Sequence, residues 1–425
     1  MKYDFTTVLD RRGRDSTAAD VIPFKGFQVD EGFSPIPMWI ADMSFKAAPA
    51  VMDAIYRRME MPNFGYFPLP KEYFDSIIRW QQRRNSVEGL LPEHIGYENG
   101  VLGGVSSALQ AFTAPGEEVL VHSPTYVGFT HTFQDTGRVA VHSPLKRDEQ
   151  GIWRMDYEDM DRKIKEHNIH LAIFCSPHNP CGRVWERREI ERAMEVYAAN
   201  NCLVISDEIW SDIIMPGYKH IPTQSVSEDA KKRTIAFYAP SKTFSLAGLV
   251  GSYHIIYNKY LRERVLRQSR LSHYNDPNVL SVHALIGGFS PEGGLGRRDD
   301  TGGKRQPGLC LRLHPGQFPR REGDAPPGHL HALSGLRGLL PQPRHKHLSA
   351  PGAGSGLRGH LAERRGLHVP RLHTHELCPA PLPGGGGHGA AEEVCVCLRN
   401  KVNNSRAALE TVEKASQSFF AAAKK

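Results

Sequence analysis

The stretch that decides the fold is Ala239-Pro-Ser-Lys-Thr-Phe-Ser-Leu-Ala-Gly-Leu249, which directly follows the β-rich run at 234–238. A lysine placed there leaves a sheet at the carboxyl end of a strand, where its amine can reach an aldehyde and form a Schiff base. Partial desolvation lowers the pKa of such an amine enough for nucleophilic work. Taken alone, the motif is more simply interpreted as a solvated loop around Lys242, so its meaning depends on the rest of the chain.

Two polar side chains follow other apolar runs. Asp207 comes just past Val204-Ile-Ser206, where a carboxylate can keep a pyridine nitrogen protonated so that the ring accepts electrons. Asn179, in Ser176-Pro-His-Asn-Pro-Cys-Gly182, offers an amide donor to a phenolate oxygen. Each has a simpler alternative, since Asp207 could be a helix N-cap and Asn179 part of an ordinary turn.

An aromatic residue and a glycine-rich stretch are further candidates. Tyr126, in Ser123-Pro-Thr-Tyr126, can present its face to a ring, although a packed loop aromatic is the simpler interpretation. Asn99-Gly-Val-Leu-Gly-Gly104 leads into a helix, whose free backbone N–H groups can hold a phosphate. Only the joint occurrence of these motifs points to one kind of site.

Up to about Pro291, short β-rich runs alternate with helical stretches. The runs lie at 118–122, 170–175, 201–206, 234–238 and 252–257. Between them, Arg188–Tyr197 has the spacing of an amphipathic helix. This alternation predicts an α/β fold with a mainly parallel sheet and with ligands at the carboxyl ends of its strands.

In chain order, the glycine loop and the S-P-T-Y, N-P-x-G, S-D-E-I and S-K-T-F motifs resemble those of the fold-type I aminotransferase-like enzymes, which use pyridoxal phosphate (PLP). Further stretches resemble the cystathionine β-lyases of the MalY/PatB type, namely Met38-Trp-Ile-Ala-Asp-Met43, Phe64-Gly-Tyr66, Ala239–Phe244, Gly251-Ser-Tyr253 and Asn275-Asp-Pro-Asn-Val279. The resemblance covers residues 1 to about 292. It implies a large domain with a sheet of the seven-stranded, mainly parallel type flanked by helices, and a small α+β domain.

The resemblance also implies a role for each candidate residue. Lys242 holds the cofactor as a Schiff base and moves the substrate Cα proton, and Asp207 pairs with the pyridinium nitrogen. Tyr126, which stacks on the ring, is the second catalytic residue. The other implied cofactor contacts come from the Asn179 side chain, the backbone of Val101 and Leu102, Ser241, Trp210, and Tyr66, which reaches the phosphate of the neighbouring subunit in a homodimer with shared sites.

Three departures from the family pattern are visible. Many relatives have Tyr or His three residues after the pyridinium aspartate, and here Trp210 stands there; an indole can pack but cannot replace the phenol. Val250 occupies the place of the phosphate-binding arginine of aminotransferases, eight residues after the lysine, which favours the lyase subgroup. No residue of the chain matches the family's substrate-carboxylate arginine.

The reaction that the resemblance implies is α,β-elimination from L-cystathionine or another S-substituted cysteine, giving a thiol, pyruvate and ammonia. The main alternative is transamination of amino acids. A PLP-binding regulator that contacts a transcription factor, as in some of this subgroup, and a catalytically dead chain are further alternatives.

Beyond residue 290 the composition changes abruptly, because Ile, Tyr, Trp and Met no longer occur while Gly, Pro, His, Arg and Leu dominate. A natural low-complexity tail is one interpretation. The genetic code favours another: read one base later, codons allowed for Pro327–Arg337 can encode an alternating apolar strand. The same offset gives Arg-Met-Asn-Phe-Ala at 374–378, which resembles the missing arginine motif, and permits a stop at 398–399. We interpret this as a single frame shift near 293–295.

The sequence therefore predicts four segments. Residues 1–60 contribute to the small domain and the active-site entrance, and 61–290 form the large PLP-binding domain. A frame-shifted remnant of the small domain occupies 291–398, and a read-through tail follows at 399–425.

Bulk properties narrow the function classes. The chain of 425 residues is 40% hydrophobic, and no apolar run approaches the ~20 residues of a membrane span. A net charge of +7 does not indicate nucleic acid, because much of the arginine lies in the abnormal segment. Seven scattered cysteines suggest neither a metal site nor a disulfide framework. We expect a cytoplasmic enzyme without a bound metal.

Overall fold

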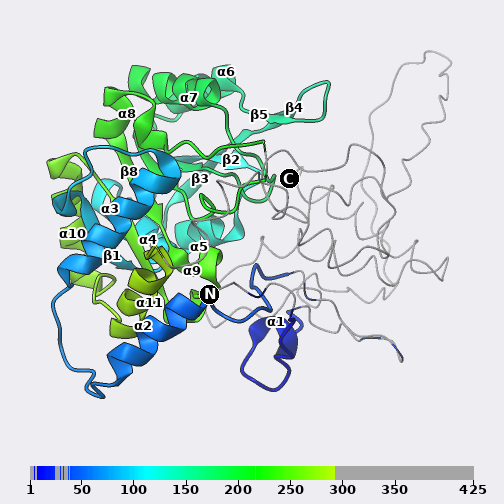
Figure 1. Cartoon of the computed structure of the whole chain (residues 1–425). Helices are drawn as coiled ribbons and strands as arrows, with labels where there is room; N and C mark the ends of the chain where they lie inside the picture. Colours follow the sequence, from blue (N-terminus) through cyan, green and yellow to red (C-terminus); the bar gives the residue numbers. More distant parts are fainter. Residues whose placement is uncertain are drawn as a thin grey trace, which may run out of the picture.

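The computed structural model of the chain describes residues 4, 7–23, 29, 32, 37, 39–215 and 217–291. A large sheet lies at the centre of these residues, with helices against both of its faces (Figure 1). Apart from Pro291, the frame-shifted remnant expected at 291–398 and the tail expected at 399–425 lie outside the described residues. Among the helices of the described residues, none is long and apolar enough to cross a membrane.

Seven strands form the central sheet in the order β1-β9-β8-β7-β6-β2-β3. All neighbours pair in parallel except β9, which runs antiparallel to both β1 and β8. The strands are β1 (Ile95–Asn99), β2 (Glu118–Ser123), β3 (Val139–Pro144), β6 (Leu171–Cys175), β7 (Leu203–Asp207), β8 (Thr234–Tyr238) and β9 (Gly251–Ile255), and β4 (Lys146–Arg147) pairs with β5 (Trp153–Arg154) in a separate two-stranded sheet. The mainly parallel sheet expected from the sequence is confirmed.

Five of these strands coincide, within two residues, with the runs expected from the sequence, because each is an apolar run buried on both faces. Strands β1 and β3 were not expected from the sequence. The middle of β1 holds Gly96 and the buried Glu98, which weaken its apolar pattern. β3 lies at the edge of the sheet and is partly exposed.

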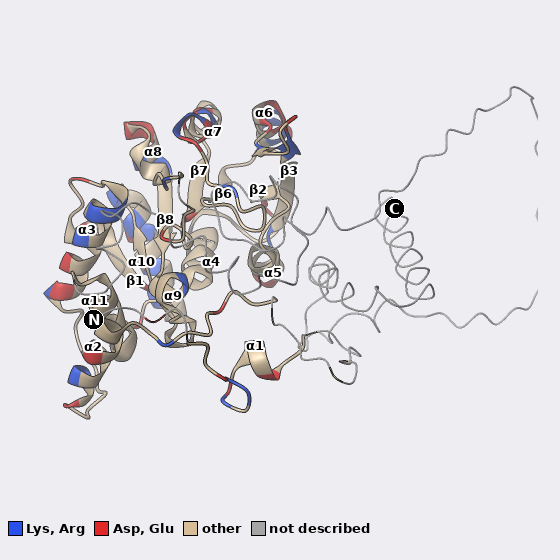
Figure 2. Ribbon diagram, turned by 45° about the vertical axis from the view of Figure 1, so that its right-hand side comes forward, with Lys and Arg blue, Asp and Glu red and all other residues tan. Residues whose placement is uncertain are grey.

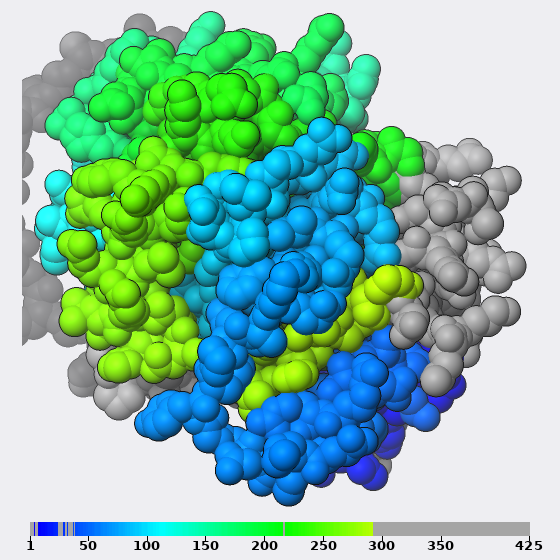
Figure 3. Space-filling view, turned by 60° about the vertical axis from the view of Figure 1, so that its left-hand side comes forward, coloured from blue at the N-terminus to red at the C-terminus, as the bar shows by residue number. Residues whose placement is uncertain are grey.

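Helices cover both faces of the sheet. One face packs on α4 (Val101–Phe112), α5 (Val127–Thr136) and α10 (Lys259–Ser272). The other face packs on α2 (Pro49–Met59), α3 (Lys71–Asn85) and α11 (Val279–Phe289) near β1, β9 and β8, and on α6 (Tyr157–Glu166), α7 (Arg187–Ala199) and α8 (Glu228–Arg233) near the remaining strands. Shorter helices are α1 (Thr17–Asp20), α9 (Pro240–Phe244), η1 (Pro92–His94), η2 (Thr223–Ser225) and η3 (Ala247–Leu249). Figure 3 shows α2, α11 and α3 side by side on the surface.

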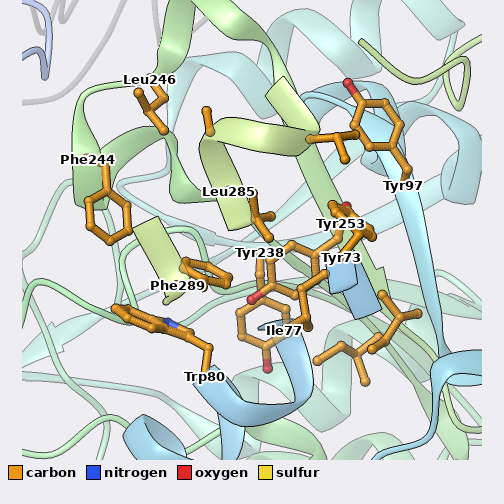
Figure 4. Close-up of a cluster of buried hydrophobic side chains, with 14 of the residues drawn as sticks. Tyr73, Ile77, Trp80, Tyr97, Tyr238, Phe244, Leu246, Tyr253, Leu285 and Phe289 are labelled. Atoms are coloured by element: carbon orange, nitrogen blue, oxygen red, sulfur yellow. The ribbon is translucent and has the colours of Figure 1, made fainter. Parts of the chain in front are cut away.

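The core beneath α9 anchors the helix that carries Lys242. Phe244 is completely buried two residues later. Its ring packs against Trp80 of α3 and Phe289 of α11, whose rings are stacked with centroids 4.3 Å apart (Figure 4). Burial of one such aromatic side chain stabilises the fold by about 1.5–3 kcal/mol. The lysine is therefore carried by a rigid element.

The motif Asn275-Asp-Pro-Asn-Val279 has a clear structural role at its end. The side chain of Asn278 caps α11 by accepting hydrogen bonds from Leu280 N (3.0 Å) and Ser281 N (3.2 Å). The backbone N–H of Asn278 donates to the hydroxyl of Tyr97 on β1 (3.1 Å). The cap thus fixes the start of α11 against the sheet.

Candidate functional site

The predicted site residues follow five strands that end at one edge of the sheet. β1, β2, β6, β7 and β8 all run in the same direction. After their carboxyl ends come, respectively, the start of α4 at Val101, then Tyr126, Asn179, Asp207 and Lys242. Residues more than 140 positions apart in the chain are therefore gathered at one edge, where open α/β sheets bind their ligands.

Lys242 lies in α9, directly after β8, and its side chain is half-buried. Its Nζ donates a hydrogen bond to the carbonyl oxygen of Ala41 (3.1 Å) and lies 5.6 Å from the centre of the Trp210 ring. Burial lowers the pKa of Lys242, and the carboxylates of Asp42 and Asp207 oppose that shift. A solvated loop lysine does not have this environment, so that alternative is wrong.

Asp207 is the last residue of β7 and is buried, with 4% of its surface exposed. One carboxylate oxygen accepts a hydrogen bond from Ile209 N (3.0 Å). Burial raises the pKa of Asp207 to about 6, while the charge of Lys242 acts in the opposite direction. The residues directly after Asp207 form a turn, and the next helix of the described chain begins only at Thr223, so the N-cap alternative is wrong. A buried carboxylate of this kind has the capacity to hold a proton on a basic ring nitrogen.

Asn179 lies in the tight turn that follows β6. Cys175, the last residue of β6, is paired in register with Asp207. Its thiol donates to Pro177 O (3.3 Å) and accepts from Asn179 N (3.5 Å). Burial, with a further contribution from the Asp207 charge, raises the pKa of this thiol well above its usual value. Sulfur contacts thus hold the turn that presents Asn179 beside the strand of Asp207.

Tyr126 and Leu102 meet over a glycine. The Tyr126 ring packs edge-on against Phe129 (centroids 5.5 Å apart). A Cβ on Gly128 would lie 2.4 Å from the Tyr126 ring and 2.9 Å from Leu102 Cδ1. Only glycine fits there, so Tyr126 lies beside the first turn of α4.

The start of α4 has the features of an anion site. Gly100 precedes it with φ of +77°, a left-handed conformation that glycine adopts without strain. The backbone N–H groups of Val101 and Leu102 belong to the first turn, where no intrahelical acceptor exists. Together with the helix dipole, such groups bind phosphate.

These features fit PLP as a group. A half-buried amine is available for its aldehyde, a buried carboxylate for its ring nitrogen, an amide for its phenolate and a helix N-terminus for its phosphate. The stretch 39–285 also matches the family model described as aminotransferase class I and II. The chain belongs to this family.

Curated relatives of the chain include both cystathionine β-lyases and aspartate aminotransferases. The chain is 35% identical over 258 residues to cystathionine β-lyase PatB of Bacillus subtilis, which is 61% of this chain and 66% of PatB. It is 27% identical over 291 residues to protein MalY of Escherichia coli, which is 68% of this chain and 72% of MalY. The chain therefore spans just under two thirds of the length of PatB.

Solved structures of the family confirm the fold-type I architecture. Cystalysin from Treponema denticola, a structure that contains a pyridoxal 5′-phosphate cofactor, has a TM-score of 0.62 and 31% identity, covering 68% of this chain and 72% of that one. The PLP-bound C–S lyase from Staphylococcus hominis has a TM-score of 0.62 and 29% identity, covering 70% and 73%.

The remaining predicted cofactor contacts are Trp210, Ser241 and Tyr66, and they differ in where they lie relative to Lys242. Trp210 is buried with its ring against Lys242, so the indole does pack there as expected. Ser241 is half-buried, and its carbonyl oxygen accepts from Leu246 N (3.0 Å), which closes the turn after α9. Tyr66 is fully exposed on the segment between α2 and α3, so a single subunit does not bring it to the other site residues.

Val250 marks the position where aminotransferases carry a phosphate-binding arginine. It lies beside the start of α4, because its carbonyl oxygen would be 3.7 Å from a Cβ on Gly100. Its φ of +67° is unusual for a β-branched residue. The structure thus has an apolar, strained residue at the edge of the candidate phosphate-binding turn.

The contacts that the segment around Ala41 makes with the lysine were not expected from the sequence. Asp42 accepts a hydrogen bond from Ser245 (3.0 Å) and pairs with Arg11 (2.7 Å). The signal present in the sequence was the motif Met38–Met43. It resembles the MalY/PatB-type lyases, but its residues alone suggest no contact with Lys242.

Proposed function

We propose that this protein is a PLP-dependent C–S β-lyase that cleaves L-cystathionine or another S-substituted cysteine to a thiol, pyruvate and ammonia. The observation that carries the proposal is a half-buried Lys242 next to a buried Asp207 at one sheet edge, in a chain 35% identical to the cystathionine β-lyase PatB. A cytoplasmic location is part of the same proposal.

The residues divide the chemistry among them. PLP, when bound, supplies a ring that accepts the electrons of the breaking Cα–H bond. Lys242 is the residue that would hold the cofactor through its aldehyde carbon, and its amine, once free, would take the Cα proton of the substrate. Asp207 would pair with the ring nitrogen and keep it protonated. Burial raises the pKa of Asp207 to about 6, because the buried carboxylate lacks a compensating positive charge, and a protonated ring nitrogen would supply one. Asn179 donates to the ring oxygen, and Tyr126 packs on the ring face.

Phosphate binding is assigned to the start of α4, with the backbone N–H groups of Val101 and Leu102 as donors. Ser241 and Trp210 complete the pocket around the lysine. Val250 supplies no charge where aminotransferases have an arginine, which supports the lyase over a transaminase.

In the overall reaction the Cα–H and Cβ–S bonds break and a Cα=Cβ double bond forms. The proton goes first to Lys242, and the sulfur leaves as a thiolate. Water then converts the resulting enamine to pyruvate and ammonia. No acceptor keto acid takes part.

The decisive assay measures pyruvate and thiol from L-cystathionine in the presence of PLP and without any keto acid. Stoichiometric release of both supports the proposal. Turnover that requires a keto acid and leaves the C–S bond intact would identify an aminotransferase instead. PLP binding without either turnover would favour a regulatory or catalytically dead protein.

We also propose a homodimer in which Tyr66 reaches the phosphate site of the other subunit. The segment between α2 and α3 extends from the body of the molecule (Figure 1), and the side chains of Met61, Phe64 and Tyr66 on it are more than half exposed. Exposed aromatic clusters of this kind mark interaction sites. Sedimentation analysis should give twice the chain mass, and Tyr66→Phe should weaken PLP binding without changing that mass. A monomer would exclude the shared site.

The four-segment division of the chain remains a proposal as well, with a frame shift near 293–295 at its centre. The match to the family model ends at residue 285, shortly before the change of composition. Sequencing the coding DNA around codon 293 tests it directly. If the frame is continuous and correct there, the substrate-carboxylate arginine has to be sought elsewhere. If it is not, the frame-restored chain is the one to assay.

A further inference from the structure

A short N-terminal segment crosses the helix that carries the reactive lysine. We call residues 39–45 the strap. In Figure 2 it passes α9 on its way between α2 and α1. Phe45, the last residue of the strap, and Ala48, just beyond it, are both buried, so the core holds this end of the strap. The strap lies about 200 positions from α9 in the sequence, so the fold alone brings the two together.

Two hydrogen bonds fasten the strap to the turn after α9. Ser245 Oγ donates to Asp42 Oδ1 (3.0 Å) and accepts from Met43 N (3.3 Å). Ser245 has a left-handed backbone, with φ of +58°, at the end of α9. Its side chain is thereby committed to the strap rather than to the helix.

Arg11 fastens the strap from the other side. Its guanidinium pairs with Asp42 Oδ2 (2.7 Å) and donates to Met43 O (3.2 Å). Both oxygens of the Asp42 carboxylate are therefore engaged, one by Ser245 and one by Arg11. The carboxylate is held in one place although it is only partly buried.

The Lys242 amine is surrounded by groups that favour a cation. Ala41 O, on the strap, accepts its hydrogen bond at 3.1 Å. The face of Trp210, from the turn after β7, lies 5.6 Å away, within the range of a cation–π contact. The charged groups that act on it are Asp42 from the strap and Asp207 from β7, and both favour the charged amine.

We propose that the strap is the resting place of the Lys242 ammonium, and that Asp42 is the positioning residue that keeps it there. The inference deepens the proposed function, on which it rests. When Lys242 takes the Cα proton, its nitrogen gains a positive charge that must be held near the substrate. The strap supplies a carbonyl and a fixed carboxylate for that charge, and Trp210 supplies the type of aromatic face that attracts a cation most strongly.

The test compares Asp42→Asn with the full-length parent chain, without cofactor. The reactivity of Lys242 toward acetic anhydride is followed against pH by mass spectrometry, with the other lysines as internal standards. Without the Asp42 charge, we expect the midpoint of reactivity to fall by about one pH unit, so that labelling at a fixed pH below it rises about tenfold. Asp10→Asn is the matched control, because Asp10 is an exposed carboxylate next to Arg11 in the sequence and pairs with Arg12, outside the strap.

An unchanged midpoint in folded Asp42→Asn would overturn the inference. If that variant does not fold, Ser245→Ala carries the test, because it frees only one oxygen of the carboxylate. Ser245→Ala should lower the midpoint of Lys242 reactivity by less than Asp42→Asn does. An unchanged midpoint in this variant would also overturn the inference. With cofactor, Asp42→Asn should change the pH profile of kcat more than KM. Since the labelling needs no turnover, absence of lyase activity would defeat the proposed function and leave this measurement intact.

Discussion

Two adjacent carboxylates at the end of β7 have opposite surroundings. Glu208 belongs to a buried polar network, which we call the Glu208 network. Its carboxylate accepts hydrogen bonds from the Tyr238 hydroxyl (2.6 Å), from Thr223 N (3.0 Å) and from the Ser206 hydroxyl, and it contacts His220 (2.8 Å). Asp207, one residue earlier, is equally inaccessible but accepts one hydrogen bond, from Ile209 N. The strand alternates its side chains between the two faces of the sheet, which separates the two environments.

The difference between them teaches how one strand serves both stability and chemistry. Burying a charge costs stability unless hydrogen bonds compensate it. At Glu208, the hydrogen bonds of the network offset this cost within the protein. At Asp207 the compensation is incomplete, the pKa rises to about 6, and the carboxylate keeps capacity for a partner from outside. Mutations at the candidate site and in the Glu208 network can test whether Asp207 serves the chemistry while Glu208 serves stability.

The largest effect is expected from Lys242→Ala. Loss of both the group that holds the cofactor and the proton carrier should slow elimination by at least ~10⁴-fold. Pyruvate release is the measurement, and Lys259→Ala, an exposed lysine of α10, is the control. Borohydride reduction of the PLP-loaded parent followed by peptide mapping should label Lys242. Label on another lysine would remove it from the mechanism.

Glu208→Ala should be the most destabilising change in the comparison. It leaves Tyr238, His220 and Thr223 without their buried acceptor, at a cost of about 3 kcal/mol in the free energy of unfolding. Urea denaturation of the cofactor-free chain measures it. Glu118→Ala, which removes only a half-exposed pair with His167, should cost less than about 1 kcal/mol. Equal costs would contradict the structural role of the network.

Asp207→Asn should slow the reaction without disrupting the fold. An amide cannot keep the ring nitrogen protonated, so elimination should slow by at least ~100-fold. Circular dichroism should be unchanged. A near-normal rate would show that Asp207, like Glu208, has a structural role and no role in the reaction.

The pH dependence of stability should carry the signature of Asp207. Its pKa is raised from 3.8 to about 6 in the folded cofactor-free chain, so its stabilising contribution is complete below pH 3.8 and is lost as the pH rises through about 6. At about 1.4 kcal/mol per pKa unit, the loss is on the order of 3 kcal/mol. Asp207→Asn should therefore be the more stable protein above pH 6, with the advantage disappearing toward pH 4. Parallel stability–pH curves would refute the raised pKa.

The smallest effect is expected at Val250, where the site edge carries backbone strain. Val250→Gly relieves a φ of +67° at a half-exposed position, which should raise stability by about 1 kcal/mol after the entropic cost of glycine. Thermal unfolding measures it. A lower melting temperature would mean that the valine side chain contributes packing that outweighs the strain.

Sequence reasoning found the large-scale arrangement because the physical signals were local. Buried apolar runs predicted five strands, and lysine, aspartate and asparagine directly after such runs predicted which edge of the sheet carries the site. The antiparallel direction of β9 could not be predicted, because a strand buried on both faces has the same pattern in either direction. Asp42 was missed for a different reason: its contacts with Ser245 span about 200 residues, and no local pattern records them.

The buried cysteines of the described chain have a consequence for the proposed lyase reaction, whose thiol product is a sulfur nucleophile. Among the residues that the structure describes, Cys175, Cys181 and Cys202 are all buried. Burial raises the pKa of Cys202 to about 12 and that of Cys175 well above its usual value, so these thiols stay protonated and poorly reactive. Thiols or sulfide released at the sheet edge, and the disulfides that form from them in air, would meet none of these three cysteines as an exposed thiolate. We therefore expect these three cysteines to form no mixed disulfides or persulfides with the thiol that the proposed reaction releases.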